Sequence, residues 1–126
     1  MIRNLRGALA VVSLVAASVF AAGASAQAPV KTMDGVLTNS AGMTLYTFDK
    51  DAGGKSACNG ACAANWPPLT AGADAKPSAD WGIVTRDDGG KQWAYKGKPV
   101  YLWGKDQKAG DKTGDGVNNL WHVAKP

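Results

Sequence analysis

Glutamate is absent from this 126-residue sequence, and all ten acidic residues are aspartate. Aspartate favours turns and helix caps, whereas glutamate favours helix interiors. Sixteen glycines point the same way, because glycine readily adopts the positive φ angles of tight turns. The composition therefore predicts a turn-rich β protein rather than a helical one.

Histidine is nearly absent, with His122 as its single representative. One histidine cannot form a histidine-based metal cluster, and no Ser-His-Asp arrangement can be argued around it. We therefore expect no catalytic residues, no metal site, no cofactor and no enzyme activity. One alternative remains open, a site for a hard cation such as Ca²⁺. The stretch "DKTGDG", residues 111–116, together with Asp106, offers oxygen ligands near glycine. It lacks the EF-hand spacing and a glutamate for bidentate closure.

Long apolar runs are also missing after residue 26. Before it, an apolar run over residues 8–22 follows two arginines and precedes the small residues 24–26. This is the layout of a secretory signal peptide, and the run falls short of the roughly 20 residues that span a bilayer. We predict cleavage before Gln27 and a periplasmic or secreted protein. No cysteine precedes Cys58, so none near the cleavage site carries a lipid.

The predicted mature chain, residues 27–126, carries twelve basic side chains against ten aspartates and has no basic cluster. This charge distribution gives no indication of nucleic-acid binding. We also expect no transmembrane segment in the mature chain. Its length suits one domain with a modest core. All five tryptophans lie in it, and each aromatic side chain buries about 150–250 Å². They should supply much of the core.

Alternating residues and turn signals divide the mature chain into strands. Residues 36–38, the turn signal "NSAG" and residues 43–48 predict a hairpin with a four-residue loop. A meander is predicted from "WGIVTR", "KQWAY" and "KPVYLW", with a two-residue turn at Lys96-Gly97. The other expectations are a flexible lead over residues 27–33, loops over residues 67–80 and 105–119, and a closing strand over residues 120–124.

The sequence repeats itself at an offset of 55 residues. The alignment needs no gap and pairs Gly42 with Gly97, Tyr46 with Tyr101, Lys50 with Lys105, Asp51 with Asp106, and Trp66 with Trp121. A fixed period with shared tyrosine and tryptophan indicates a duplication. We predict one all-β antiparallel, loop-rich domain over residues 27–126, built from two pseudo-symmetric repeats over about residues 35–69 and 90–124.

Each repeat contains the pattern Y-x-[FW]-x-x-D. The motif residues are Tyr46, Phe48 and Asp51 in "YTFDKD", and Tyr101, Trp103 and Asp106 in "YLWGKD". The first copy continues into "DAGGKSACNGACAANWPPL". The chain thus closely resembles bacterial secreted-repeat proteins, also called predicted lipoproteins with a Y-x-[FWY]-x-x-D motif, over essentially all of its mature length. The function of that family is uncharacterised, so the resemblance implies no activity. The chain departs from the lipoprotein members in lacking a lipidation cysteine.

Two interpretations of the motif remain open. In the first, the aromatic residues pack the core, and Asp51 and Asp106 accept hydrogen bonds from loop amides where each strand ends. In the second, the same aromatic residues form a ligand-binding face with an acidic rim. In both, a tryptophan strand closes each repeat, at Trp66 and Trp121.

Cys58 and Cys62 are the only cysteines. An even number in an exported chain predicts a disulfide, here across a very small loop. A redox-active pair is less favoured, because three residues separate the cysteines and no helix clearly follows. Ala63 stands where a haem-attachment motif has histidine. The second copy has Thr113 and Val117 at these positions, so the bridge belongs to one repeat only.

These features together predict an exported, non-catalytic envelope protein. We expect a binding or interaction module whose partner is an unknown envelope component or a small ligand. The alternative is a metal-, haem- or redox-associated accessory protein of the periplasm. An enzyme ranks last, because one histidine and scattered aspartates offer no cluster of titratable groups.

Overall fold

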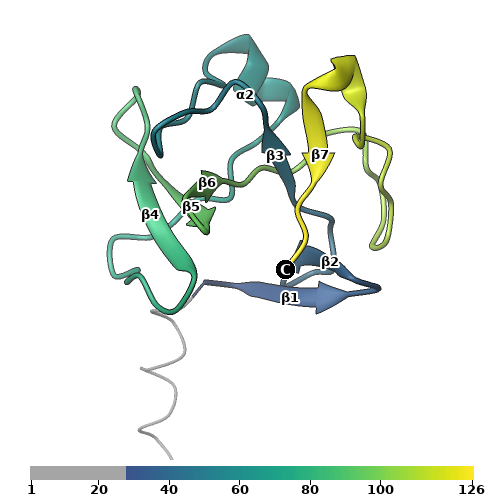
Figure 1. The fold of residues 1–126 in the computed structure, drawn as a ribbon, viewed down its shortest axis with the longest axis horizontal. Helices are drawn as coiled ribbons and strands as arrows, with labels where there is room; N and C mark the ends of the chain where they lie inside the picture. Colours follow the sequence, from purple (N-terminus) through teal and green to yellow (C-terminus); the bar gives the residue numbers. More distant parts are fainter. Residues whose placement is uncertain (1–27) are drawn as a thin grey trace, which may run out of the picture.

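A computed structural model describes residues 28–126 of the chain (Figure 1). The predicted signal peptide over residues 1–26 and its cleavage before Gln27 lie outside the described residues. Within the described part, no helix combines the length and apolar character that crossing a membrane requires.

Short antiparallel strands supply most of the regular structure, which confirms the predicted all-β class. The strands are β1 (Val30–Met33), β2 (Val36–Asn39), β3 (Tyr46–Phe48), β4 (Trp81–Thr85), β5 (Lys91–Tyr95), β6 (Lys98–Pro99) and β7 (Trp121–Val123). The helices are α2 (Ala61–Asn65) and the 3-10 helix η2 (Val117–Asn119). Strand β1 pairs with β2, β3 pairs with β7, and β5 lies between β4 and β6 as the predicted meander (Figure 1).

The expected flexible lead is wrong, because residues 30–33 form β1. This strand pairs with β2 in full register, from Val30 opposite Asn39 to Met33 opposite Val36. Its turn is Asp34-Gly35, and both residues have positive φ, 52° and 80°. Asp-Gly is a preferred sequence for the two-residue type I′ hairpin turn, so the signal was present in the sequence.

The next hairpin turns differ between the two copies. In the first copy, the Asn39 amide donates to the Met43 carbonyl (2.9 Å), which leaves a three-residue loop instead of the predicted four. Gly42 ends that loop with a φ of 86°. In the second copy, Lys96-Gly97 forms the predicted two-residue turn, with φ of 50° and 85°.

The extra loop residue changes the alignment of the copies. The Leu45 amide donates to the Leu37 carbonyl in the first copy, and the Val100 amide donates to the Trp93 carbonyl in the second. Leu45 and Val100 are 55 residues apart, whereas Leu37 and Trp93 are 56 apart. The gapless offset of 55 therefore holds only after the hairpin turns.

The two copies meet around a pseudo-twofold axis that passes between Tyr46 and Tyr101. Each of these residues donates its amide to the carbonyl of the other, at 2.8 and 2.9 Å. Matching hydrogen bonds lie on either side: Leu69 to Val100 and Ala124 to Leu45, then Gly104 to Asn65 and Asp49 to Leu120. The predicted repeats are thus paired directly, backbone to backbone.

Two clusters of buried side chains form the core. One is mainly aliphatic and is built from Leu37, Leu45, Leu69, Trp93, Val100 and Ala124. The other is mainly aromatic and is built from Tyr46, Cys58, Trp66, Tyr101 and Trp121. The aromatic cluster lies on the axis, so the residues that define the motif hold the two copies together.

Candidate functional site

Four aromatic rings form one continuous stack through the aromatic cluster, in the order Trp103, Trp66, Trp121 and Phe48. The ring centroids are 3.9, 3.7 and 4.1 Å apart, and the two central tryptophans are parallel. Because Trp66 and Phe48 come from the first copy, each outer ring packs on the tryptophan of the other copy. The stack therefore joins the two copies through side chains that alternate between them.

Each motif tyrosine completes this packing edge-on. Tyr46 meets Trp66 at 5.4 Å and Tyr101 meets Trp121 at 5.2 Å, with ring planes almost perpendicular. Edge-to-face contact is a favourable geometry for aromatic rings. Both tyrosines are fully buried, so they offer no aromatic face to a ligand.

The motif aspartates bind the tyrosine of the opposite copy. Tyr46 Oη donates to Asp106 Oδ2 at 2.6 Å, and Tyr101 Oη donates to Asp51 Oδ2 at 2.8 Å. The spacing within one copy gave no sign of this exchange, because a repeat reveals its period but not its partner. The tyrosine and the aspartate of one motif therefore serve two different hydrogen bonds.

The second carboxylate oxygen makes the predicted contacts with the loop. Asp51 Oδ1 accepts from the Ala57 amide at 2.6 Å, and Asp106 Oδ1 accepts from the amide and hydroxyl of Thr113 at 3.0 and 2.6 Å. These contacts match the first interpretation of the motif. The aspartates fix the start of each loop and, at the same time, join the copies.

Burial changes the acid–base behaviour of these groups. It raises the pKa of Tyr101 to about 12, and it raises the pKa of Tyr46 further above the ordinary value, with the hydrogen bond to Asp106 adding to the effect. Burial also raises the pKa of Asp51, against the hydrogen bonds from Ala57 and Tyr101 that lower it. The tyrosines remain protonated donors over the whole physiological range.

A buried arginine, which the sequence did not predict, fixes the loop of the first copy and has no counterpart bound to the loop of the second copy among the described residues. Arg86 is 5% exposed and donates to Ser56 Oγ (3.0 Å), Gln92 Oε1 (2.8 Å) and the Cys58 carbonyl (2.7 Å). Ser56 Oγ in turn hydrogen-bonds Tyr101 Oη. A buried guanidinium needs such partners, because an unpaired buried charge is costly. The only signal was an arginine at the end of an apolar strand.

The predicted disulfide joins Cys58 to Cys62 and is confirmed. Helix α2 contains Cys62, so the expectation that no helix follows is wrong. The Cys58 side chain is fully buried in the aromatic cluster, and its carbonyl accepts from Arg86. The bridge thus fixes the loop that positions the Arg86 contacts.

The other candidate residues lie at the surface. His122, on β7, contacts Asp49 Oδ2 through Nε2 at 2.8 Å. In the Asp-rich loop, Asp111 accepts from the amides of Gln107 and Lys108, and Asp115 accepts from Val123. Within residues 28–126, no group of three or more His, Cys, Asp or Glu side chains lies close enough to hold a metal ion.

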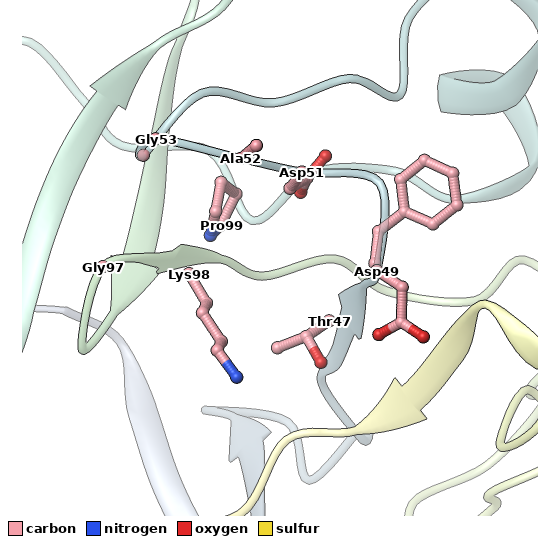
Figure 2. Close-up of a pocket in the computed structure, with 10 residues that line it drawn as sticks. Thr47, Asp49, Asp51, Ala52, Gly53, Gly97, Lys98 and Pro99 are labelled. Carbon is pink, nitrogen blue, oxygen red and sulfur yellow. The ribbon is translucent and has the colours of Figure 1, made fainter.

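One concave site breaks the symmetry of the copies. A hollow of about 280 Å³ lies between the end of β3, the loop after it and β6 (Figure 2). We call it the first-copy hollow; its lining is Thr47, Phe48, Asp49, Asp51, Ala52, Gly53, Gly54, Gly97, Lys98 and Pro99. Figure 2 shows the Lys98 and Thr47 side chains extending to the same side of β6, with the Asp49 carboxylate beside Thr47.

The equivalent place in the second copy is filled by its own loop. The Ala109 Cβ lies 3.0 Å from where a Cβ on Gly42 would stand, and the Gly110 amide donates to the Gly42 carbonyl (3.3 Å). The Thr44 hydroxyl also donates to the Asp111 carbonyl at 2.7 Å. At the first-copy hollow, the residue matching Thr44 is Pro99 of the second copy, which has no hydroxyl, and the first-copy loop leaves the space beside it open.

A second hollow of about 340 Å³ adjoins the first and shares Thr47, Asp49 and Lys98 with it. Its other lining residues are Tyr95, Lys96, His122, Val123, Ala124 and Lys125. The two hollows together place Lys98 at the centre of a polar surface. The sequence gave no periodic signal for this surface, because it joins segments that are far apart in the chain.

Comparisons with known proteins give one match. No curated protein and no solved structure matches the chain. The sequence model of one family, described as a secreted repeat of unknown function, matches residues 28–70 and again residues 82–125. These two matches cover more than half of the chain and correspond to the two copies that pair around Tyr46 and Tyr101. The chain belongs to this family of secreted repeats of unknown function.

Proposed function

We propose that the protein is an exported, non-catalytic binding module, cleaved before Gln27 and active in the periplasm or outside the cell. The basic start, apolar run and small residues at positions 24–26 support export by a signal peptide. Membership of a secreted family supports the same location. The first-copy hollow is its binding site.

One observation carries the choice of site: the same place is open in the first copy and filled in the second. The loop of the second copy closes it, through contacts of Ala109 and Gly110 with Gly42 and of Asp111 with Thr44. At the first-copy hollow, Gly54 corresponds to Ala109 and Pro99 corresponds to Thr44, so the contacts that fill the other place are absent. Lys98 lies there at the position that corresponds to Met43. A concave site with a few polar groups is the usual form of a small-molecule site.

The state of the titratable groups supports a role without catalysis. Tyr46, Tyr101 and Asp51 are the groups whose pKa values are raised, and each is held in hydrogen bonds between the copies. Both oxygens of Asp51 accept hydrogen bonds, so its carboxylate has a structural role at the edge of the hollow. Perturbed pKa values arise in such structural networks as well as in active sites.

The test is a panel of small solutes, with sugars, sugar acids, amino acids, polyamines and inorganic phosphate, added to the folded protein labelled with nitrogen-15. We expect at least one class to shift the amide signals of Thr47, Gly53 and Gly97 in a saturable way. The variant Thr47→Trp places an indole in the hollow and should remove that response. If no class moves these signals, a binding role for the hollow is wrong.

The alternative role with a metal, haem or redox group has its own readout. Purified native protein should show no absorption from a chromophore, and its native mass should equal that of the chain with one disulfide. A bound metal or chromophore would contradict the proposal. So would loss of binding upon selective reduction of the bridge in a protein that stays folded.

A further inference from the structure

We propose that the first-copy hollow binds a small hydroxylated carboxylic acid, of the size and chemistry of a monosaccharide acid. This inference rests on the proposed function, because it names the ligand class of the same site. It depends on the charge around the hollow, the hydrogen-bonding groups within it, and the residues that replace them in the second copy.

The charge around the two adjoining hollows favours an anion. Lysines 96, 98 and 125 line them, against the aspartates 49 and 51. Asp51 uses both of its oxygens, and Asp49 Oδ2 contacts His122. Among residues 28–126, no acidic side chain lies within ion-pair distance of Lys98. The Lys98 ammonium is therefore available for a carboxylate, which makes a charge-assisted hydrogen bond.

The remaining groups in the hollow suit hydroxyls, which both donate and accept. The Thr47 hydroxyl has both capacities, and Asp49 Oδ1 accepts. The amides of Gly53 and Gly54 donate to no acceptor within the described part of the chain. A ligand with several hydroxyls can use all of these groups at once, whereas a simple carboxylate uses only Lys98.

Size and charge exclude other classes of ligand. The volume of about 280 Å³ lies just under the usual range of about 300–1,000 Å³ for small-molecule sites, which suits a monosaccharide rather than a longer chain. An amine would face three lysines. A phosphate dianion would approach the carboxylates of Asp49 and Asp51, which repel a doubly charged group more than a singly charged one.

The duplication supplies matched substitutions. Around the filled place, the residues that correspond to Lys98 and Thr47 are Met43 of the first copy and Leu102 of the second, and neither side chain can bind a carboxylate or a hydroxyl. Lys98→Met therefore replaces one side chain by the residue that the protein itself uses in the same turn. Lys98 is exposed, so the fold should tolerate the change. Lys91→Met, at another exposed strand position, is the control.

The experiment titrates the nitrogen-15-labelled protein with D-galacturonate, D-galactose and acetate and follows the amides of Thr47, Gly53 and Gly97. We expect saturable shifts with galacturonate. Binding of galactose or acetate should be about tenfold weaker or more, because each lacks one set of contacts. Lys98→Met should weaken galacturonate binding by about tenfold, the effect of losing one charge-assisted hydrogen bond, and Lys91→Met should leave it unchanged.

The outcomes separate the ligand class from the proposed function. If galactose binds as tightly as galacturonate, or if Lys98→Met binds galacturonate as the wild type does, the acid class is wrong. If amino acids or phosphate move the same amides and galacturonate does not, the class is also wrong and the binding role is supported. If no solute of the wider panel moves them, the proposed function itself fails.

Discussion

The two copies have matching contacts where they meet, at the centre of the molecule, and different contacts in their loops, at its edges. At the centre, the stack of Trp66 on Trp121 and the crossed tyrosine–aspartate bonds follow the pseudo-twofold axis closely. At the edges, the first copy has a disulfide, the Arg86 contacts and an open hollow, whereas the second copy closes its loop on Gly42. The duplication thus preserved the contacts that join the copies, and the loops were free to diverge.

The centre also explains why neither copy is complete alone. Tyr46 is fully buried, and its hydroxyl depends on Asp106 from the other copy. If the two were separated, the buried Tyr46 hydroxyl would lose its acceptor and Asp106 Oδ2 would lose its donor, at about 1–3 kcal/mol for each group. The motif therefore makes each copy depend on the other for its buried hydrogen bonds.

The largest predicted effect tests whether the central tryptophans of the two copies, Trp66 and Trp121, contribute equally to stability. Trp66→Ala and Trp121→Ala should each lower the free energy of unfolding by about 3–5 kcal/mol, the usual cost of truncating a buried tryptophan. Trp66 and Trp121 stack on each other, and each also contacts one further stacked ring and the edge of one tyrosine. The two losses should therefore be similar. Urea unfolding followed by circular dichroism measures both.

Trp81→Ala is the control for this comparison. Trp81 is only half-buried, at the start of the edge strand β4, so its loss should be clearly smaller. Losses at Trp66 and Trp121 that differ by more than about 2 kcal/mol, a large fraction of a small domain's stability, would show that the stack is not shared equally.

The second prediction uses the difference between the crossed pairs. Tyr46→Phe should cost up to about 3 kcal/mol, because it removes the donor to Asp106, which is 8% exposed. Tyr101→Phe should cost less, about 1 kcal/mol, because Asp51 is less buried and water can replace the lost donor. Ser56, the other partner of the Tyr101 hydroxyl, keeps its hydrogen bond from Arg86. Both are measured by urea unfolding at neutral pH. The reverse order would contradict the assignment of Asp106 as the more deeply buried partner.

The third prediction concerns the first copy only. Replacing both Cys58 and Cys62 by alanine should lower the free energy of unfolding by about 2 kcal/mol, the value expected for closing a loop this short. The loss should be accompanied by faster hydrogen exchange at the Ala57 amide and around Ser56. It should not be accompanied by faster exchange at the Thr113 amide, which donates the equivalent hydrogen bond to Asp106 in the second copy. Equal changes in both loops would mean that the bridge stabilises the whole domain rather than one copy.

How much of this was predictable depends on whether a feature lies within one segment or joins two. The all-β class, the meander, the duplication and the disulfide follow from local patterns: alternation, Lys96-Gly97, a fixed period and two nearby cysteines. The first strand was missed although Asp34-Gly35 is itself a hairpin signal, because residues 30–33 do not alternate.

Features that join two segments were not predictable. The sequence placed Tyr46 and Asp106 in equivalent motifs, but only the antiparallel pairing at the axis makes one the partner of the other. The buried position of Arg86 depends on loop residues about thirty positions away, such as Ser56. The first-copy hollow likewise combines the end of β3, the loop after it and β6. It exists because that loop leaves the space next to β6 unfilled.

The last predicted effect is a change in the pH dependence of stability, which tests one crossed tyrosine–aspartate pair at a time. The pKa of Tyr101 is about 12 in the folded protein, above the ordinary value of 10. Between pH 10 and 12 the unfolded chain loses this proton and the folded chain keeps it, so the free energy of unfolding falls as pH rises. The contribution of Tyr101 is fully present below pH 10 and falls by about 1.4 kcal/mol for each pH unit above it.

Tyr101→Phe should therefore flatten this fall by about that amount, because phenylalanine has no proton to lose. Unfolding by urea at pH 9, 10 and 11 gives the slope for the wild type and the variant. Tyr46→Phe, whose tyrosine also has a raised pKa for the same reason of burial, should flatten the fall at least as much. A slope that neither variant changes would mean that the tyrosines ionise as freely in the folded protein as in the unfolded chain. The crossed tyrosine–aspartate pairs would then be accessible to water, and the aromatic cluster between the copies would be less tightly packed than the loops around it.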